Sequence, residues 1–135
     1  MSVVKVGEVL QRKSGDVVTV RPRMSVTAAA GVLAKHGVGA VVISGDGCRI
    51  DGIFTERDLV HGIARDGEAY LARQVQDAAL HKVYTCSRDD DLEHVILTMK
   101  RGRIRHMPVA ADGVLVGLIS LVDILREHLA KAGIH

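Results

Sequence analysis

Apolar residues along the chain switch between two spacings, and the switches predict short strands between helices. After Ser25, a favourable N-cap residue, apolar side chains recur at helical spacing until Gly37. The run Ala40–Ile43 is instead apolar throughout, which is typical of a buried strand. Ile50–Phe54 predicts the strand that returns beside it, and Thr55 is placed to begin the next helix.

The same order of elements follows in the second half of the chain. Helices are predicted at Val6–Arg12, Ser25–Gly37, Thr55–Ala64, Val75–Leu80, Asp89–Arg101 and Ser120–Ala132. Strands are predicted at Val17–Val20, Ala40–Ile43, Ile50–Phe54, Val83–Cys86, His106–Ala110 and Val114–Ile119. Gly67–Ala72 is the predicted connector. Each half therefore has the order β-α-β-β-α, with a helical lead-in.

An internal repeat supports this division. Gly52–Asp58 reads Gly, two large apolar residues, a hydroxyl residue, two variable positions and Asp, and Gly117–Asp123 has the same pattern. Two copies predict an α/β fold, an α+β sandwich of two repeats that span residues 1–67 and 68–135. We expect a pseudo-two-fold axis between the repeats, with their sheets packed face to face.

The composition limits the classes of function. Of 135 residues, 47% are hydrophobic and 25% are charged, which is typical of a folded protein. A net charge of +2 without a Lys/Arg run, together with 2% aromatic residues, argues against nucleic-acid binding. No apolar stretch approaches the length of a membrane span, about 18 residues, and Met1–Gly7 lacks the apolar core of a signal peptide. We therefore expect a cytoplasmic protein that binds neither nucleic acid nor membranes.

Metal-ligating and catalytic residue types are scattered along the chain. Cys48 and Cys86 lack the spacing of a metal site, which favours two free thiols. Glu56 and Asp58 face different ways on a helical turn and make a poor acid–base pair. Five histidines share no ligand spacing and are expected at the surface or at helix ends: His36, His61, His81, His94 and His128. The sequence therefore predicts no metal site and no enzyme.

The repeated hydroxyl and carboxylate residues supply the candidate binding chemistry. Thr55 and Ser120 lie at strand-to-helix junctions, where a hydroxyl and free backbone N–H groups favour an anion. Asp58 and Asp123 follow in the first helical turn, where a carboxylate can accept hydrogen bonds from the two vicinal hydroxyls of a ribose. The alternative interpretation is that these residues only cap their helices.

The two copies, which close with G-I-F-T-E-R-D and G-L-I-S-L-V-D, resemble a tandem pair of CBS domains (a Bateman module) over essentially the whole chain. The resemblance implies a small stand-alone protein that binds an adenosine-containing ligand in clefts between the repeats: AMP, ADP, ATP, S-adenosylmethionine or NAD(H). It implies a non-catalytic regulatory module, without a catalytic cofactor, that senses energy or redox state for an unidentified protein target. The alternative is a structural dimerisation module whose clefts are vestigial.

In that family, a site combines the second strand and the hydroxyl–Asp motif of one repeat with the start of the first helix of the other. One predicted nucleotide site accordingly contains Arg21, Met24, Arg105, His106, Ser120 and Asp123. Arg105 and His106 would contact phosphate there, unless they only form a solvated basic strand edge. The second predicted site, which is less basic, contains Val38, Gly39, Thr55, Arg57 and Asp58, with Asp89–Val95 beside it.

Apolar helix faces predict a homodimer. Ala28–Gly31 is rich in small residues that allow close packing, and the helices also carry Leu59, Ile63, Ile124 and Leu125. One small pair of repeats can hardly cover that much apolar surface. We therefore expect two chains to pair through these helices into a flat disc of four CBS repeats.

Overall fold

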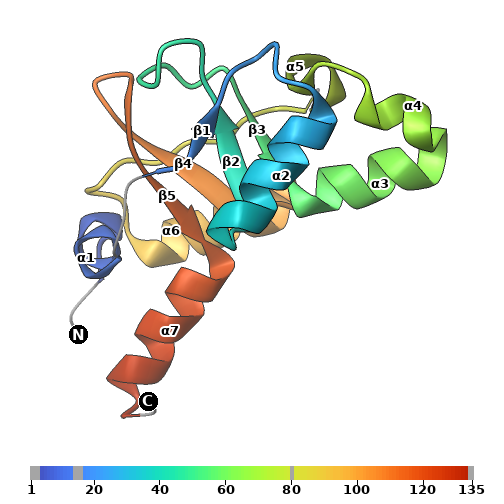
Figure 1. Ribbon diagram of the computed structural model, residues 1–135. Coiled ribbons are helices and arrows are strands. Elements are labelled where there is room, and N and C mark those ends of the chain that lie inside the picture. Colours follow the sequence, from blue (N-terminus) through green and yellow to red (C-terminus); the bar gives the residue numbers. More distant parts are fainter. Residues whose placement is uncertain (1–3, 14–16, 80, 134–135) are drawn as a thin grey trace. The chain divides into compact units, whose positions relative to one another are not determined.

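The computed structural model describes residues 4–13, 17–79 and 81–133 and confirms the mixed α/β class (Figure 1). Its helices are α1 (Val6–Arg12), α2 (Val26–His36), α3 (Glu56–Asp66), α4 (Glu68–Leu71), α5 (Val75–Ala78), α6 (Leu92–Gly102) and α7 (Leu121–Lys131). Its strands are β1 (Thr19–Val20), β2 (Ala40–Ile43), β3 (Gly52–Thr55), β4 (His106–Ala111) and β5 (Val114–Ser120).

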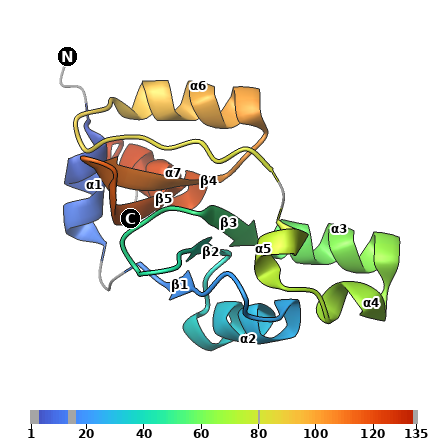
Figure 2. The same cartoon turned by 90° about the horizontal axis from the view of Figure 1, so that it is seen from above.

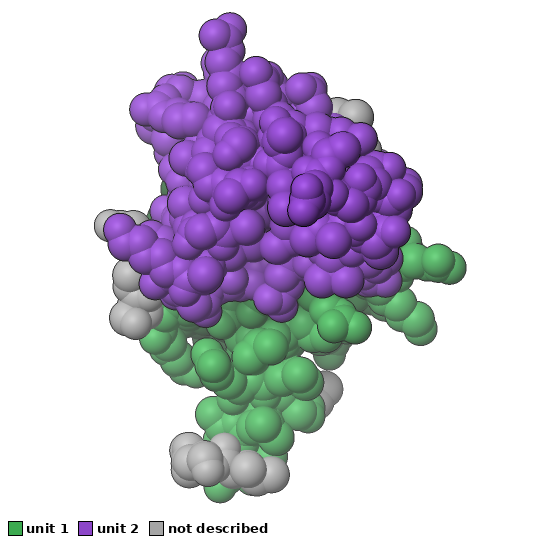
Figure 3. Space-filling view, turned by 45° about the vertical axis from the view of Figure 1, so that its right-hand side comes forward, with its two compact units in different colours: residues 1–16, 84–135 green, residues 17–83 purple. Residues whose placement is uncertain are grey.

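Packing divides the chain into two compact units, which Figure 3 colours separately. Residues 17–83 form the first-repeat unit, and residues 1–16 with 84–135 form the second-repeat unit. The predicted division between residues 67 and 68 follows the sequence repeat instead. Packing thus groups α1 with the second repeat, and α4 and α5 with the first.

The first-repeat unit is built on a three-stranded sheet. β1 pairs in parallel with β2, and β2 pairs antiparallel with β3. β2 is buried along its whole length, as its uninterrupted apolar run predicts. Ser25 caps α2 by accepting a hydrogen bond from the Ala28 N–H at 3.1 Å, and Gly37 ends α2 in the left-handed conformation. The apolar face of α2 packs into the same core as β2 and β3 (Figure 1).

The predicted connector Gly67–Ala72 contains a short helix, α4, because Tyr70 belongs to the core. Tyr70 is 1% exposed, and its hydroxyl donates a hydrogen bond to the Ala78 carbonyl at 3.2 Å. Its ring packs directly on Gly62 of α3, where a side chain of any size would overlap it. This glycine therefore lets the chain fold back on α3.

The second-repeat unit is built on the antiparallel hairpin of β4 and β5. α6 lies over the two strands (Figure 2) and contributes the buried Val95 and Met99. From α1, Val6 and Val9 enter the same core. The lead-in helix is therefore an integral part of this unit.

The predicted strand Val83–Cys86 is reduced to a single bridge with β4 at Cys86, whose N–H donates to the Pro108 carbonyl at 3.1 Å. In the first repeat the parallel ladder is longer, because the Val42 N–H donates to the Val18 carbonyl at 3.1 Å. Pro108 stands at the corresponding place in β4 and has no N–H, so the ladder cannot continue toward Val83.

Two helical glycines test this packing. Gly62→Ala should lower the free energy of unfolding by about 1–3 kcal/mol, because the added methyl group overlaps the Tyr70 ring. Gly31→Ala is the matched control in α2, where an added Cβ meets nothing within 4 Å, and it should raise the free energy of unfolding by about 0.5–1 kcal/mol. Urea unfolding measures both changes. Equal effects would show that Tyr70 does not fill the space beside Gly62.

Candidate functional site

Both candidate motifs are built as reciprocal helix caps. At the end of β3, the Thr55 hydroxyl accepts a hydrogen bond from the Asp58 N–H at 3.1 Å, and the Asp58 carboxylate accepts from the Thr55 N–H at 2.9 Å. At the end of β5, Ser120 and Asp123 make the same two bonds at 3.1 and 2.8 Å. Both motifs therefore cap their helices, and the ribose role stays a prediction.

Each aspartate also contacts a basic side chain in a way that sequence reasoning missed. Asp123 accepts a hydrogen bond from the Lys13 amine at 2.9 Å, and Asp58 lies 3.2 Å from Nε2 of His81. Lys13 directly follows α1, and His81 precedes the bridge residue Cys86. Both basic residues therefore come from segments that lead into the first strand of a repeat. His81 is exposed, as expected, but it has a specific partner.

These contacts fix the charge of the two carboxylates. Burial raises the pKa of Asp123, but hydrogen bonds from Lys13 and the Ser120 N–H outweigh it and hold the pKa below its ordinary value. Burial also raises the pKa of Asp58, but the hydrogen bonds from His81 and Thr55 outweigh it and hold the pKa below its ordinary value. Both aspartates are thus ionised at neutral pH and act as hydrogen-bond acceptors.

The described hydrogen bonds engage one oxygen of each carboxylate. The described hydrogen bonds to the Asp123 side chain, from Ser120 and Lys13, end on Oδ2. The described bonds to the Asp58 side chain, from Thr55 and His81, also end on Oδ2. No described hydrogen bond ends on Oδ1 of either residue, although an ionised carboxylate accepts at both oxygens. Each cap therefore leaves one carboxylate oxygen without a described hydrogen bond.

The helix N-termini offer fewer free donors than the sequence suggests. In α7, the Leu121 N–H donates to the Arg105 carbonyl at 2.8 Å, and the Asp123 N–H donates to Ser120. Among the first three N–H groups of α7, only that of Val122 has no described partner. Side chains must therefore supply most of the binding energy for an anion at this end.

The second-repeat unit brings together four predicted site residues: Arg105, His106, Ser120 and Asp123. His106 lies opposite Ser120 in the register of β4 and β5. Arg105 is exposed immediately before β4, and its carbonyl is bonded to the first turn of α7. The backbone of a basic residue thus adjoins the helix end that carries the candidate carboxylate.

The first-repeat unit brings together Val38, Gly39, Thr55, Arg57 and Asp58. The Gly39 carbonyl accepts a hydrogen bond from the Glu56 N–H at 3.0 Å, and Arg57 is exposed in the first turn of α3.

The remaining predicted residues lie outside these two groups. The Arg21 guanidinium donates to the Gly45 carbonyl, and Met24 packs against the first-repeat core. Asp89–Val95 belongs to the second-repeat unit. Their combination with the motif of the opposite repeat remains a prediction.

No helix in residues 4–13, 17–79 and 81–133 is long and apolar enough to cross a bilayer. Within the same ranges, no cluster of three or more His, Cys, Asp or Glu side chains is arranged to hold a metal ion.

Comparison with known protein families identifies the family to which this chain belongs. The CBS domain matches this chain twice, at residues 6–65 and 75–130. The chain belongs to the CBS-domain family. The two matches follow the internal repeat, so the protein is a tandem CBS pair.

Individual relatives agree with this assignment. An uncharacterized protein from Methanopyrus kandleri is 33% identical over 93% of this CBS pair, which spans 63% of the relative's length. The structure of a CBS-domain containing protein from Agrobacterium tumefaciens is 40% identical, with a TM-score of 0.87 over 93% of this chain and 94% of that one. A CBS domain protein from Pyrobaculum aerophilum, solved in complex with AMP, shares the fold at 24% identity, with a TM-score of 0.79 over 95% of this chain and 99% of that one.

The His81–Asp58 pair predicts a pH-dependent stability. Asp58 raises the pKa of His81 above its unfolded value of about 6.5, so the pair stabilises the protein below that pH and loses this contribution as the pH rises through the raised pKa. The lowered pKa of Asp58 sets the acid limit, because the contribution also disappears as the pH falls from about 3.9 through that pKa. His81→Gln should therefore lower the free energy of unfolding more at about pH 5.5 than at about pH 9.

His61→Gln is the control for this experiment. His61 is an exposed histidine of α3 with no described contact, so its replacement should have a similar small effect at both pH values. Urea unfolding of the three proteins at the two pH values gives the comparison. A His81→Gln effect that does not change with pH would contradict the ion pair.

Proposed function

We propose that this CBS pair is a non-catalytic regulatory module that binds adenosine-containing ligands, namely AMP, ADP, ATP or NAD(H), and senses energy or redox state. The observation that carries the proposal occurs once in each repeat. A charged carboxylate, Asp58 or Asp123, stands in the first turn of a helix, and its Oδ1 has no described hydrogen bond. Two such positions on one small chain favour ligand binding over capping alone.

A ribose matches the open oxygen chemically. Its two vicinal hydroxyls are donors, and Oδ1 of an ionised aspartate accepts both. Oδ2 stays engaged with the cap and with Lys13 or His81, which holds the carboxylate in one orientation. Hydrogen bonds to a charged acceptor are roughly twice as strong as neutral ones.

Phosphate recognition is proposed for Arg105 and His106 in the second-repeat unit. Arg105 offers a planar fork of donors at the N-terminus of α7, where the helix dipole also favours an anion. The AMP complex of the Pyrobaculum aerophilum protein supports a nucleotide with one adenosine and at least one phosphate as the ligand type.

A regulatory role fits the electrostatics better than a catalytic one. The two carboxylates have lowered pKa values and donate no proton near neutral pH, so they are poor general acids. A ligand that binds one arrangement of the repeats better than another shifts their equilibrium, and a protein target can detect that shift.

We also infer a homodimer of four CBS repeats through the exposed helix faces. Three helices carry exposed apolar residues: Val60 and Ile63 on α3, Ile96 and Leu97 on α6, and Val122, Leu125 and Leu129 on α7. The sequence-based selection is corrected at Ile124, which is 4% exposed and lies in the core, and Leu59 is half-buried.

Calorimetry with AMP tests the ligand assignment. Asp123→Asn keeps an oxygen for the cap but loses the charge, so AMP should bind the second-repeat site about tenfold more weakly or worse, because a charged hydrogen bond contributes roughly 1.5–3 kcal/mol. Asp58→Asn should weaken a different binding event. GMP should bind the wild-type protein more weakly than AMP.

Three results would count against the assignment. Equal affinity for AMP and GMP would remove the adenine preference. Loss of the same single event in both variants would show that the motifs serve one site. Absence of binding by any of the proposed nucleotides would favour the structural dimerisation module.

Sedimentation tests the dimer. Leu125→Glu places a charge on a residue that is 51% exposed on α7 and should convert the dimer into a monomer of 14.5 kDa at micromolar concentration. Val114→Glu, at an exposed apolar residue of β5, is the matched control and should leave the dimer intact. A monomeric wild-type protein under these conditions would contradict the inference.

A further inference from the structure

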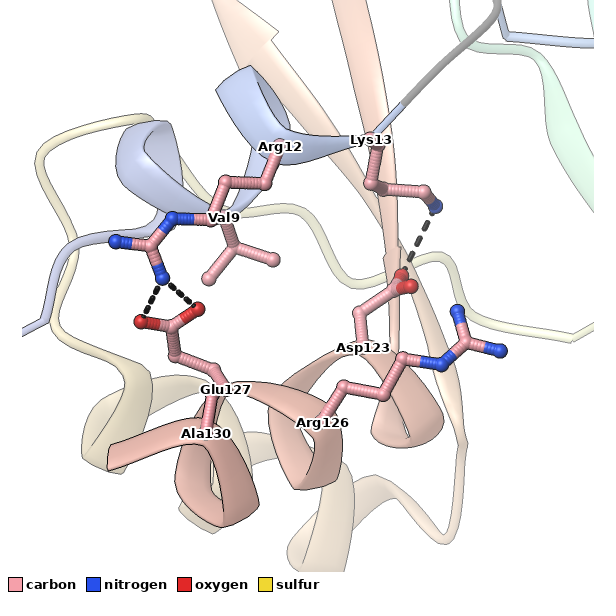
Figure 4. Close-up of a pocket in the computed structure, with 7 residues that line it drawn as sticks. All are labelled: Val9, Arg12, Lys13, Asp123, Arg126, Glu127 and Ala130. Carbon is pink, nitrogen blue, oxygen red and sulfur yellow. Dashed lines mark hydrogen bonds and ion pairs between the residues drawn. The ribbon is translucent and has the colours of Figure 1, made fainter. Parts of the chain in front are cut away.

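A cleft of about 370 Å³ lies between α1 and α7 of the second-repeat unit (Figure 4). Its volume is within the range of small-molecule sites, roughly 300–1,000 Å³. Two apolar residues, Val9 and Ala130, line it together with charged side chains from both helices. None of these charged residues except Asp123 belongs to the nucleotide sites predicted from the sequence.

Ion pairs neutralise most of the charge in this cleft. The Arg12 guanidinium contacts both carboxylate oxygens of Glu127, which is 6% exposed. The Lys13 amine contacts Asp123 and also donates to the Leu118 carbonyl at 2.8 Å. Both carboxylates therefore already have a cation as a partner.

Arg126 is the charged residue of this cleft that the described ion pairs do not include. It is exposed, lines the cleft, and has no described hydrogen bond or ion pair. Figure 4 shows its guanidinium at the Asp123 end of the cleft together with the Lys13 amine, while Arg12 and Glu127 lie at the other end. This end of the cleft therefore has a net positive charge and a free guanidinium, which suit an oxyanion.

Arg126 and Arg105, the two arginines that are candidates to contact phosphate, lie at different places relative to α7. Arg126 follows Asp123 by three residues, about 4.5 Å along the axis of α7. Arg105 instead adjoins the N-terminus of α7, where its carbonyl is bonded to the N–H of Leu121. A ribose held by Asp123 would thus have Arg105 beside the first turn of α7 and Arg126 in the next turn.

We propose that Lys13 and Arg126 form a subsite for a second phosphate group, so that the second-repeat site selects a nucleoside di- or triphosphate over a monophosphate. This inference rests on the proposed function, because Asp123 must hold the ribose. Lys13 keeps its bond to Leu118 and shares its charge between Asp123 and the phosphate.

The first repeat lacks this arrangement in the residues that correspond. His61 occupies the position that corresponds to Arg126 in the aligned motif. His81 contacts Asp58, as Lys13 contacts Asp123. Preference for a second phosphate therefore belongs to the second-repeat site alone.

Calorimetry with AMP and ADP tests the subsite. Wild-type protein should bind ADP at the second-repeat site at least about tenfold more tightly than AMP, because the second phosphate adds a charged contact. Arg126→Gln should remove most of that preference and leave AMP within about twofold. Lys13→Gln should act in the same direction, whereas Arg105→Ala should weaken AMP and ADP alike.

Arg101→Gln is the matched control. Arg101 is an exposed arginine of α6 with no described partner, and it lies outside the cleft. Its replacement should leave the ratio of ADP to AMP affinity at the wild-type value. An unchanged unfolding midpoint of Arg126→Gln confirms that the variant is folded.

The outcomes separate this inference from the one it rests on. Equal wild-type affinities for AMP and ADP, or an unchanged ratio in Arg126→Gln, would overturn the subsite while the proposed function stands. A wild-type protein that binds neither nucleotide nor adenosine would overturn the proposed function, and the subsite with it.

Discussion

The reciprocal hydrogen bonding of the two hydroxyl–Asp motifs is the constraint on which the rest of the site depends. Thr55 with Asp58, and Ser120 with Asp123, each close the junction between a strand and a helix. The bonds occupy Oδ2 and hold the carboxylate rigid, which leaves Oδ1 in a fixed place at low cost in conformational entropy. Capping and ligand binding are therefore compatible, since they use different oxygens of one carboxylate.

The two copies share this geometry and differ in the charges around it. Asp123 has Lys13 as its partner and Arg126 one turn away, whereas Asp58 has His81. Lysine keeps its charge at physiological pH, but the charge of a histidine changes within that range. One fold thus carries a lysine beside one aspartate and a histidine beside the other, which gives the two repeats different electrostatic conditions for an anionic ligand.

Local signals explain what the sequence could predict. N-caps, glycine stops and the repeated motif act within a few residues, so the helices other than α4, and both caps, are predicted close to their observed bounds. The strand predicted at Val83–Cys86 is reduced to one bridge because Pro108 has no N–H to donate. The sequence contains this cause, but it is recognised only when the two repeats are aligned. Lys13, His81 and Arg12 were missed because their partners are far away in sequence. The contact of Tyr70 with Gly62 depends on how α4 folds back on α3, and the spacing of apolar residues in the sequence does not predict that fold-back.

The central claim is that each open Oδ1 accepts the ribose hydroxyls of an adenosine ligand. Calorimetric titration with adenosine and with 2′,3′-dideoxyadenosine isolates those hydroxyls, because the two compounds share the base and neither has a phosphate. The account predicts that dideoxyadenosine binds at least about tenfold more weakly, since the hydrogen bonds to a charged carboxylate are lost. Equal affinities for the two compounds would show that Asp58 and Asp123 only cap their helices.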